Sequence, residues 1–242
     1  RIAAEASGNP TGLMMARPTA AGDVVGDVSA ACFRYAMSVA AAEGVPVGGN
    51  GVLELATDNA ALDRFSAMAE GGALAAISAE LVEAAQARAV ANVALDRPAL
   101  WHRAGGWVDP RVWTQALAGV ARPARADIRS IVTAAEGWAL QDATGATVTK
   151  VDAVILASAM SGVALRPGAE LPLQAIRGQI TRIAETAASR RLQACLAFGG
   201  YLSPALTGCH VAGATYTRGG FDPQGWPVAV QAEDHRRTLA TL

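Results

Sequence analysis

The sequence predicts an α+β protein built on a mixed or antiparallel sheet with helices, and three observations support this prediction. Residues 200–203 and 210–216 predict two strands joined by a turn that contains proline and glycine, which indicates a β-hairpin. Residues 24–43 carry apolar side chains at helical spacing, which predicts an amphipathic helix. Residues 128–150 alternate short apolar segments with a turn, which is typical of an antiparallel meander.

The amino-terminal part should begin with a loop and continue with a helix and a short strand. Residues 7–18 are rich in turn formers and predict the loop. Gly44 can adopt the left-handed conformation that closes many helices, so the helix over 24–43 should end there. Residues 45–57 contain Gly-Gly-Asn-Gly followed by apolar residues, which predicts a turn that enters a strand.

Three further helices are predicted from their capping residues. Asp58 is expected to cap a helix over 59–69, and Ser78 a helix over 79–90. Asp109 followed by proline starts the third helix, over 110–120.

Residues 101–107 predict a strand or extended loop interrupted by two glycines. His102 lies in this stretch, beside a tryptophan. No acid partner for it is visible in the sequence, so a structural role is favoured over a catalytic base.

The second half of the chain predicts mostly strands. Three meander strands are followed by an apolar run over 151–157, typical of a strand buried on both faces. Residues 171–183 predict one strand, with Gly178 interrupting its interior. Residues 222–230 predict a loop, and 232–242 begin a helix that the end of the chain cuts off.

Composition excludes several classes of protein. The chain has 242 residues, 52% hydrophobic and 17% charged, so it can bury a substantial core. Its three cysteines lack CxxC spacing, so neither a zinc site nor a disulfide framework is indicated, and a reducing cytoplasm suits them. No uninterrupted apolar run reaches the roughly 18 residues of a membrane span. We therefore expect a cytoplasmic protein with no metal, no targeting segment and no membrane.

The chain begins with Arg1 inside what looks like a running segment, so we expect a fragment of a longer protein. A dinucleotide-binding domain normally opens with a strand, a GxGxxG turn and a helix whose amide groups hold the pyrophosphate. That fingerprint is absent from these residues, and the glycines at 48–51 lack its spacing.

Several short motifs nevertheless resemble a known family. The motifs are Ala6-Ser7-Gly8-Asn9-Pro10-x-Gly12, Gly105-Gly106-Trp107-Val108-Asp109-Pro110, Arg177-Gly178-Gln179, Gly200-Tyr201-x-x-Pro204 and Gly213-Ala214-Thr215-Tyr216. In this order they resemble FAD-dependent oxidoreductases of the D-amino-acid oxidase and glycine oxidase type. They are most similar to the FAD-dependent domain of the bifunctional enzymes that make 5-methylaminomethyl-2-thiouridine at the tRNA wobble position.

The resemblance implies FAD as cofactor, a D-amino-acid oxidase-like fold and oxidation of a secondary amine. It also implies a division of the chain: an FAD-domain loop over 1–20, a mainly helical part of the substrate domain over 21–100, an FAD-domain helix, meander and strand over 101–165, and the substrate-domain sheet with the start of a helix over 166–242. The segments of the FAD domain that flank these residues would lie outside the chain.

The resemblance also implies site residues. The cofactor contacts would be Ser7, Gly8, Asn9, Gly12, Leu13, Ile131, Val132, Ala157 and Ser158. Tyr201, Tyr216 and Gln179 would contact the substrate. Tyr201 and Arg177 would be catalytic, with Arg177 holding a carboxylate through two hydrogen bonds or, alternatively, forming a structural ion pair.

The resemblance implies tRNA as substrate and a possible fused methyltransferase domain. The formal net charge of −1 gives no general attraction to nucleic acid, so tRNA would need a local basic patch. Arg122, Arg125 and Arg129 form one candidate patch, and Arg190 with Arg191 another. Two alternatives stay open: an oxidase of free amino acids such as glycine or sarcosine, and a non-catalytic binding domain. The sequence leaves the oligomeric state undetermined.

Overall fold

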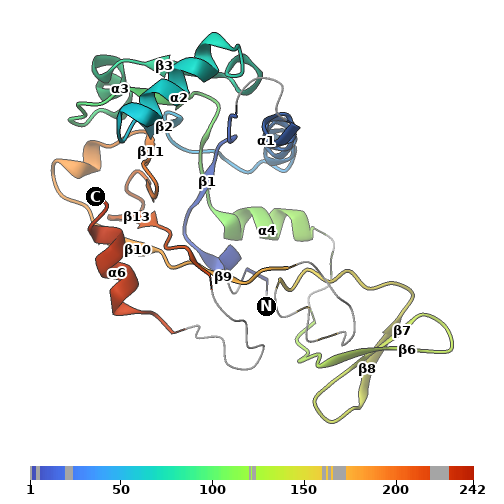
Figure 1. The fold of residues 1–242 in the computed structure, drawn as a ribbon. Coiled ribbons are helices and arrows are strands. Elements are labelled where there is room, and N and C mark those ends of the chain that lie inside the picture. The colour runs from blue at the N-terminus through green and yellow to red at the C-terminus, as the bar shows by residue number, and fades with distance from the viewer. Residues whose placement is uncertain are drawn as a thin grey trace. The chain divides into compact units, whose positions relative to one another are not determined.

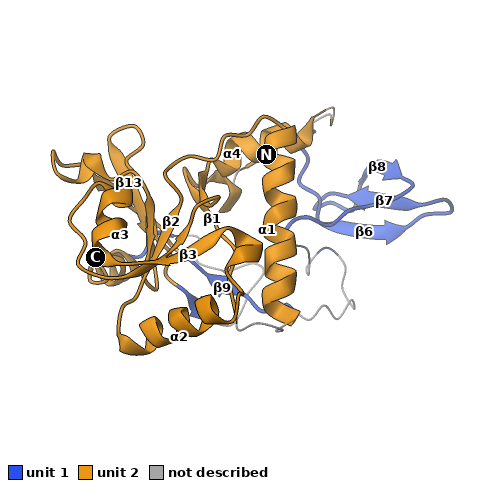
Figure 2. Cartoon of the chain, turned by 90° about the horizontal axis from the view of Figure 1, so that it is seen from above, with its two compact units in different colours: residues 1, 122–178, 216–231 blue, residues 2–121, 179–215, 232–242 orange. Residues whose placement is uncertain are grey.

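The computed structural model describes residues 2–3, 6–19, 24–119, 121, 124–159, 162, 165, 173–218 and 229–242. The chain forms two compact units, which Figure 2 shows in different colours. Unit 1 comprises residues 1, 122–178 and 216–231, and unit 2 comprises residues 2–121, 179–215 and 232–242. Each unit therefore combines segments that lie far apart in the sequence.

Unit 2 contains a seven-stranded sheet with the order β10-β13-β12-β11-β2-β4-β3 (Figure 1). Its strands are β2 (Val52–Leu55), β3 (Ala79–Val82), β4 (Ala99–His102), β10 (Thr181–Ala184), β11 (Cys195–Ala197), β12 (Tyr201–Leu202) and β13 (Cys209–Gly213). The pair β11 and β2 is parallel, and all the other neighbours in this sheet are antiparallel. The prediction of an α+β fold on a mixed sheet is confirmed.

Different elements cover the two faces of this sheet. The remaining elements of unit 2 are η1 (Ala6–Gly8), β1 (Gly12–Met14), α1 (Val24–Ala42), α2 (Asn59–Glu70), η2 (Ala75–Ile77), α3 (Ala84–Ala91), β5 (Gly106–Val108), α4 (Pro110–Ala118), η3 (Ser189–Arg191) and α6 (Ala232–Leu239). On one face, Leu100 packs with Phe65 of α2 and Phe33 of α1. On the other, Leu53 and Leu196 pack against the alanines of α3. The hydrophobic core of unit 2 therefore lies in a layer on each side of the sheet.

The helix ends follow the predicted capping residues. The Asp58 carboxylate accepts a 2.8 Å hydrogen bond from a first-turn N–H of α2. Asp109 caps α4 in the same way at 2.9 Å, and Gly44 follows α1 with a φ of +65°. Helix α4 ends at Ala118, and Val120 lies outside the described residues.

Helix α1 is unusually apolar for a helix of which little is buried. Of the helices that the structure describes, it alone is long and apolar enough to cross a membrane by length and composition, which is weak evidence by itself. Its buried side chains are Ala30, Phe33 and Ala40, and its outer side exposes Val28 and Tyr35.

The prediction of a helix capped by Ser78 is wrong. Ser78 adopts a φ of +53°, and the four residues after it form β3. This strand pairs antiparallel with β4, placing Ala79 opposite His102. The pairing is non-local and outweighs the local preference of alanine and leucine for a helix, so α3 starts only at Ala84.

The single strand predicted over 171–183 is also wrong, because two separate strands occur there. In unit 1, β9 (Ile176–Arg177) pairs with β14 (Thr217–Arg218), whereas β10 pairs with β13 in unit 2. The chain passes from one unit to the other at Gly178, the residue that interrupted the predicted strand. Residues 171–172 lie outside the described part of the chain.

The predicted hairpin is confirmed, with a shorter second strand. Tyr201 in β12 lies opposite Gly213 in β13. Behind the turn, the buried His210 has a ring nitrogen 2.8 Å from the carbonyl oxygen of Ser203, which ties the two arms together. Strand β13 ends at Gly213, so Tyr216 is not part of it.

In unit 1, the predicted meander is confirmed as β6 (Ser130–Thr133), β7 (Trp138–Gln141) and β8 (Thr147–Val151). The strand predicted over 151–157 is wrong. Within the described residues nothing pairs with 153–157, and the Ile155 side chain is 92% exposed. A continuous apolar run forms a buried strand only where neighbouring strands and covering layers surround it.

The carboxyl-terminal helix predicted over 232–242 is present as α6. Helix α6 ends at Leu239, and the N–H of Ala240 donates to the carbonyl of Arg236 at 2.9 Å to close the last turn. Of the loop predicted over 222–230, residues 222–228 lie outside the described residues.

The cap of α2 gives a first testable prediction. Asp58→Ala should lower the free energy of unfolding by about 1 kcal/mol, because an N–H at the start of α2 loses its acceptor. Urea denaturation of both proteins measures the difference. Asp63→Ala is the matched control, since Asp63 is an exposed carboxylate of the same helix and does not cap it. Equal losses for the two variants would contradict the capping role.

Candidate functional site

Tyr201 lies on the face of the seven-stranded sheet that also carries Cys195 and Val52. Its register partners are Ala197 on one side and Gly213 on the other. A side chain at Gly213 would begin 3.4 Å from the Tyr201 ring and only 2.9 Å from the Ile180 side chain. The side chains of Tyr201 and Ile180 therefore fill the space beside the Gly213 backbone, and this packing on the sheet fixes the position of the Tyr201 ring.

The Tyr201 phenol stays protonated over a wide pH range. Burial raises the pKa of Tyr201, a nearby Thr11 hydroxyl lowers it by a smaller amount, and the charged form of Cys195 raises it slightly. Burial also raises the pKa of the Cys195 thiol to about 12. At neutral pH this part of the sheet therefore presents a neutral phenol and a neutral thiol.

Thr11 is a residue that the sequence did not single out. It is 1% exposed, and among the described residues its hydroxyl has no hydrogen-bond partner of standard geometry. It lies inside the predicted cofactor loop and close to Tyr201. The effect on the pKa of Tyr201 shows that the Thr11 hydroxyl lies next to the phenol, so the loop supports Tyr201 through this residue.

Two predicted motifs that are about a hundred residues apart in the sequence meet in the structure. Strands β1 and β5 pair antiparallel, so that Gly12 lies opposite Val108 and Leu13 opposite Trp107. A side chain at Gly12 would begin 3.3 Å from the Pro110 ring. The loop that precedes β1 is thus anchored against the start of α4.

The predicted cofactor residues fall in both units. Ser7, Gly8, Asn9, Gly12 and Leu13 belong to unit 2, and Ile131, Val132, Ala157 and Ser158 belong to unit 1. None of them is buried, so every one has surface available to a ligand. That these residues contact the flavin stays a prediction.

The predicted substrate residues also divide between the units. Gln179 lies with Tyr201 in unit 2, where its backbone N–H donates to the Thr215 hydroxyl at 3.0 Å. Arg177 and Tyr216 lie in unit 1. The Arg177 guanidinium donates to the carbonyl of Ala229 at 3.2 Å. That Tyr201 and Tyr216 flank one substrate stays a prediction.

The buried His102 has the acid neighbour that the sequence did not reveal. It is 1% exposed, and its Nε2 lies 3.5 Å from Oε2 of Glu54, on the neighbouring strand β2. No local pattern could have linked these residues, because the sheet brings them together. Among the described residues no cluster of three potential ligands could hold a metal ion, so His102 belongs to no such cluster.

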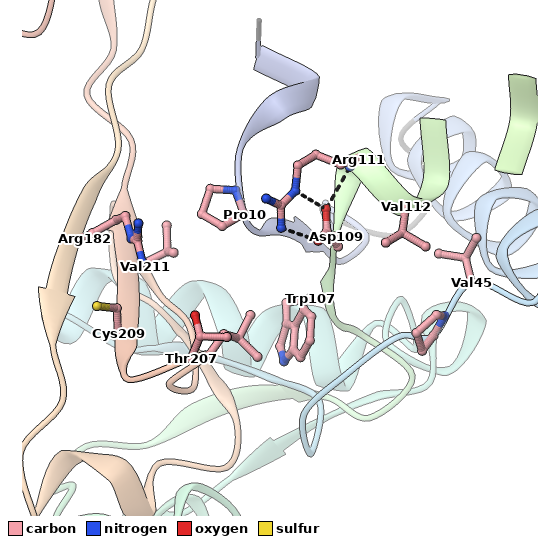
Figure 3. Close-up of a pocket in the computed structure, with 12 residues that line it drawn as sticks. Pro10, Val45, Trp107, Asp109, Arg111, Val112, Arg182, Thr207, Cys209 and Val211 are labelled. Atoms are coloured by element: carbon pink, nitrogen blue, oxygen red, sulfur yellow. Dashed lines mark hydrogen bonds and ion pairs between the residues drawn. The ribbon is translucent and has the colours of Figure 1, made fainter. Parts of the chain in front are cut away.

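Unit 2 contains a pocket of about 270 Å³ (Figure 3). Its lining is Pro10, Val45, Pro46, Trp107, Asp109, Arg111, Val112, Arg182, Leu206, Thr207, Cys209 and Val211. Arg111 grips Asp109 with bonds of 2.9 and 2.5 Å, and this hydrogen bonding lowers the pKa of Asp109. The lining thus joins apolar walls to one internal ion pair and one further arginine.

The family model described as FAD dependent oxidoreductase (DAO) matches residues 1–242. The chain belongs to this family of FAD-dependent oxidoreductases, which confirms the predicted enzyme class and cofactor.

The chain is also similar in sequence to individual proteins that have a more specific name. The chain is 30% identical over 249 residues to the tRNA 5-methylaminomethyl-2-thiouridine biosynthesis bifunctional protein MnmC of Methylobacillus flagellatus, with 100% of the chain and 37% of that protein covered. It is 34% identical over 224 residues to the protein of the same name from Magnetococcus marinus, with 88% of the chain and 33% of that protein covered. The chain thus spans about a third of the length of these relatives.

Solved structures share the fold at lower identity. Glycine oxidase from Bacillus cereus has a TM-score of 0.69 and 17% identity, covering 99% of the chain and 69% of the oxidase. Iminodiacetate oxidase from Chelativorans has a TM-score of 0.70 and 17% identity, covering 97% of the chain and 68% of that enzyme. The predicted glycine oxidase-like fold is confirmed.

The burial of Tyr201 gives a second prediction. In the full-length protein, the phenolate of Tyr201 should form only above pH 10, because burial raises the pKa of this phenol from its ordinary value of 10.0. The absorbance of this phenolate is the signal that Tyr201→Phe removes. Since the folded pKa is the higher one, the stability contributed by the neutral phenol is present below pH 10 and declines as pH rises further. A wild-type minus variant difference spectrum at 295 nm measures the midpoint. A midpoint at or below pH 10 would contradict the burial of the phenol.

Proposed function

We propose that the protein containing this chain oxidises a secondary amine with FAD and acts on tRNA. Its substrate would be 5-carboxymethylaminomethyluridine at the wobble position, from which the carboxymethyl group is removed. The observation that supports this choice is the identity of 30% and 34% to proteins named for tRNA 5-methylaminomethyl-2-thiouridine biosynthesis, extending over most of the chain. The similarity to glycine oxidase rests on 17% identity and supports the fold alone.

The chemistry would proceed in two steps. FAD supplies the two-electron acceptor for a hydride leaving the carbon between the amine and the carboxylate. The resulting imine is hydrolysed, which breaks the carbon–nitrogen bond, releases glyoxylate and leaves an aminomethyl group on the uridine. The protein would contribute binding, orientation and electrostatics.

Tyr201 would act as a hydrogen-bond donor rather than as a base. Its raised pKa keeps the phenol protonated at neutral pH. Hydride loss requires the neutral amine with a free lone pair, and neither the neutral phenol of Tyr201 nor the neutral thiol of Cys195 stabilises an ammonium. The sheet surface at Tyr201 would therefore favour the reactive form of the substrate.

Arg177 would hold the substrate carboxylate. A guanidinium can form two parallel hydrogen bonds with a carboxylate, and the bond of Arg177 to the Ala229 carbonyl would fix the direction of its side chain. Gln179 and Tyr216 would complete the substrate contacts. A fused methyltransferase domain in the remainder of the protein and a cytoplasmic location belong to the same proposal.

The third prediction tests the substrate. Full-length protein mixed anaerobically with hypomodified tRNA should bleach its flavin absorbance, whereas glycine and sarcosine should not. Apparent affinity for tRNA should fall as salt rises, because contacts with phosphates release counterions. Rapid bleaching by glycine or sarcosine, with none by tRNA, would replace the proposal with a free amino-acid oxidase.

The fourth prediction concerns Tyr201. In the full-length enzyme, Tyr201→Phe should lower turnover of hypomodified tRNA about tenfold or more, because a hydrogen bond worth roughly 1.5 kcal/mol is lost at the reacting group. Flavin content should stay normal, since the ring remains. Stopped-flow flavin reduction and the flavin-to-protein absorbance ratio provide the two measurements. Unchanged kinetics would remove Tyr201 from the substrate site, and loss of flavin would make it a cofactor residue.

A further inference from the structure

We propose that the pocket of unit 2 lined by Trp107 and Arg182 binds a tRNA nucleotide next to the one being modified. The base would lie against Trp107, and Arg182 would hold the phosphate. This inference rests on the proposed tRNA substrate and adds a second contact to it. The reacting nucleotide itself belongs at Tyr201, which does not line this pocket.

The charge of the pocket favours an anion. Asp109 and Arg111 neutralise each other through their paired hydrogen bonds. Arg182 has no carboxylate or hydrogen-bond partner for its guanidinium among the described residues. It therefore leaves the pocket with a positive charge that is available to a phosphate, and Figure 3 shows the arginine beside Val211 and Pro10.

The basic patches predicted from the sequence are weaker candidates. Arg129 pairs with Asp127 at 2.8 Å, and Arg190 pairs with Glu185 at 2.9 Å. Arg122 lies outside the described residues. Within the described part of unit 2, Arg182 and Arg17 are the arginines whose guanidinium groups have no partner, and only Arg182 of these two lines a pocket.

Trp107 supplies a rigid wall. Its indole lies against Gly48, where a side chain would begin only 2.4 Å from ring atoms of the indole. Backbone bonds fix the same contact, since the N–H of Gly48 donates to the carbonyl of Trp107 at 2.8 Å and the reverse bond measures 3.0 Å. An aromatic ring held in this way can stack with any base, because every base has a flat π-face.

The position of the pocket fits a neighbouring nucleotide. Arg182 lies opposite Val211 in the sheet, and Tyr201 lies opposite Gly213, two residues further along β13. Both side chains therefore project from the same face, about 7 Å apart along the strand direction. The volume of about 270 Å³ lies just below the usual range for small-molecule sites, so the pocket has room for no more than a single nucleotide.

A charge substitution tests the phosphate contact. In the full-length enzyme, Arg182→Gln should raise the KM for hypomodified tRNA about tenfold, because one charge-assisted hydrogen-bonding group is lost, with little change in kcat. The slope of log affinity against log salt should fall by about one. Arg17→Gln is the matched control, since Arg17 is equally exposed and unpartnered but lies outside the pocket, and its kinetics should stay at the wild-type values.

The alkylation rates of two cysteines can show whether the pocket is occupied, without any substitution. Cys209 lines the pocket, and Cys32 is exposed on α1 outside it. Hypomodified tRNA should slow alkylation of Cys209 at least fivefold while leaving Cys32 unchanged, as measured by peptide mass spectrometry. Uridine monophosphate and inorganic phosphate are tested in parallel to separate a nucleotide of tRNA from a free nucleotide or a simple anion.

Each outcome has a distinct meaning. Protection of Cys209 by tRNA, together with the raised KM of Arg182→Gln, supports the inference. If tRNA reduces the flavin but neither protects Cys209 nor responds to Arg182→Gln, the inference fails and the proposed function stands. Protection by uridine monophosphate or phosphate without protection by tRNA overturns the tRNA assignment of the pocket. Failure of tRNA to reduce the flavin overturns the proposed function itself, whatever the alkylation result.

Discussion

The parallel pairing of β2 with β11 is the contact on which the sheet of unit 2 depends. Strands β2, β3 and β4 form one antiparallel group from residues 52–102, and β10 to β13 form another from residues 181–213. Among the strands that the structure describes, only the ladder between Val52–Glu54 and Cys195–Ala197 joins the two groups. A bond of 3.0 Å from the N–H of Cys195 to the carbonyl of Gly51 extends this ladder, and Val52, Leu53 and Cys195 are completely buried.

Gly51, the residue that precedes β2, makes the pairing of β2 with β11 possible. Gly51 has a φ of +86°, and a side chain there would begin 2.6 Å from the carbonyl oxygen of His102. The same turn places Gly48 under the Trp107 indole. The glycine-rich turn over 48–51 therefore allows β2 to join the sheet and also leaves room for the Trp107 indole to pack beside it. Trp107 packs against a cluster that includes Ala197, and Tyr201 lies opposite Ala197 in the sheet.

The sequence predicted features that are specified locally. The caps at Asp58 and Asp109, the end of α1 at Gly44 and the hairpin turn after Tyr201 depend on a few neighbouring residues, and the structure has all of them. The turn residues of the meander were equally visible. Among site residues, the family resemblance pointed to the loop around Gly12, which the structure anchors through β5.

Features that depend on distant partners were missed or misassigned. The segment after Ser78 is a strand only because β4 lies beside it, and the segment around Gly178 is divided because its halves pair in different units. Glu54 approaches His102 only through the sheet. Nor did any sequence pattern identify Thr11 or Arg182, because burial without a partner and the absence of an ion pair are properties of the folded chain.

The order in which the strands are made has a consequence for synthesis of the protein. β2 is complete at Leu55, but its partner β11 begins only at Cys195, about 140 residues later. At translation rates of about 5–20 residues per second, the nascent chain carries β2 with one unpaired edge for roughly 7 to 28 seconds. Such an edge exposes backbone groups and the apolar side chains of Val52 and Leu53 to other nascent chains. The ribosome-bound protein therefore needs protection of this edge until the second half of the sheet has emerged.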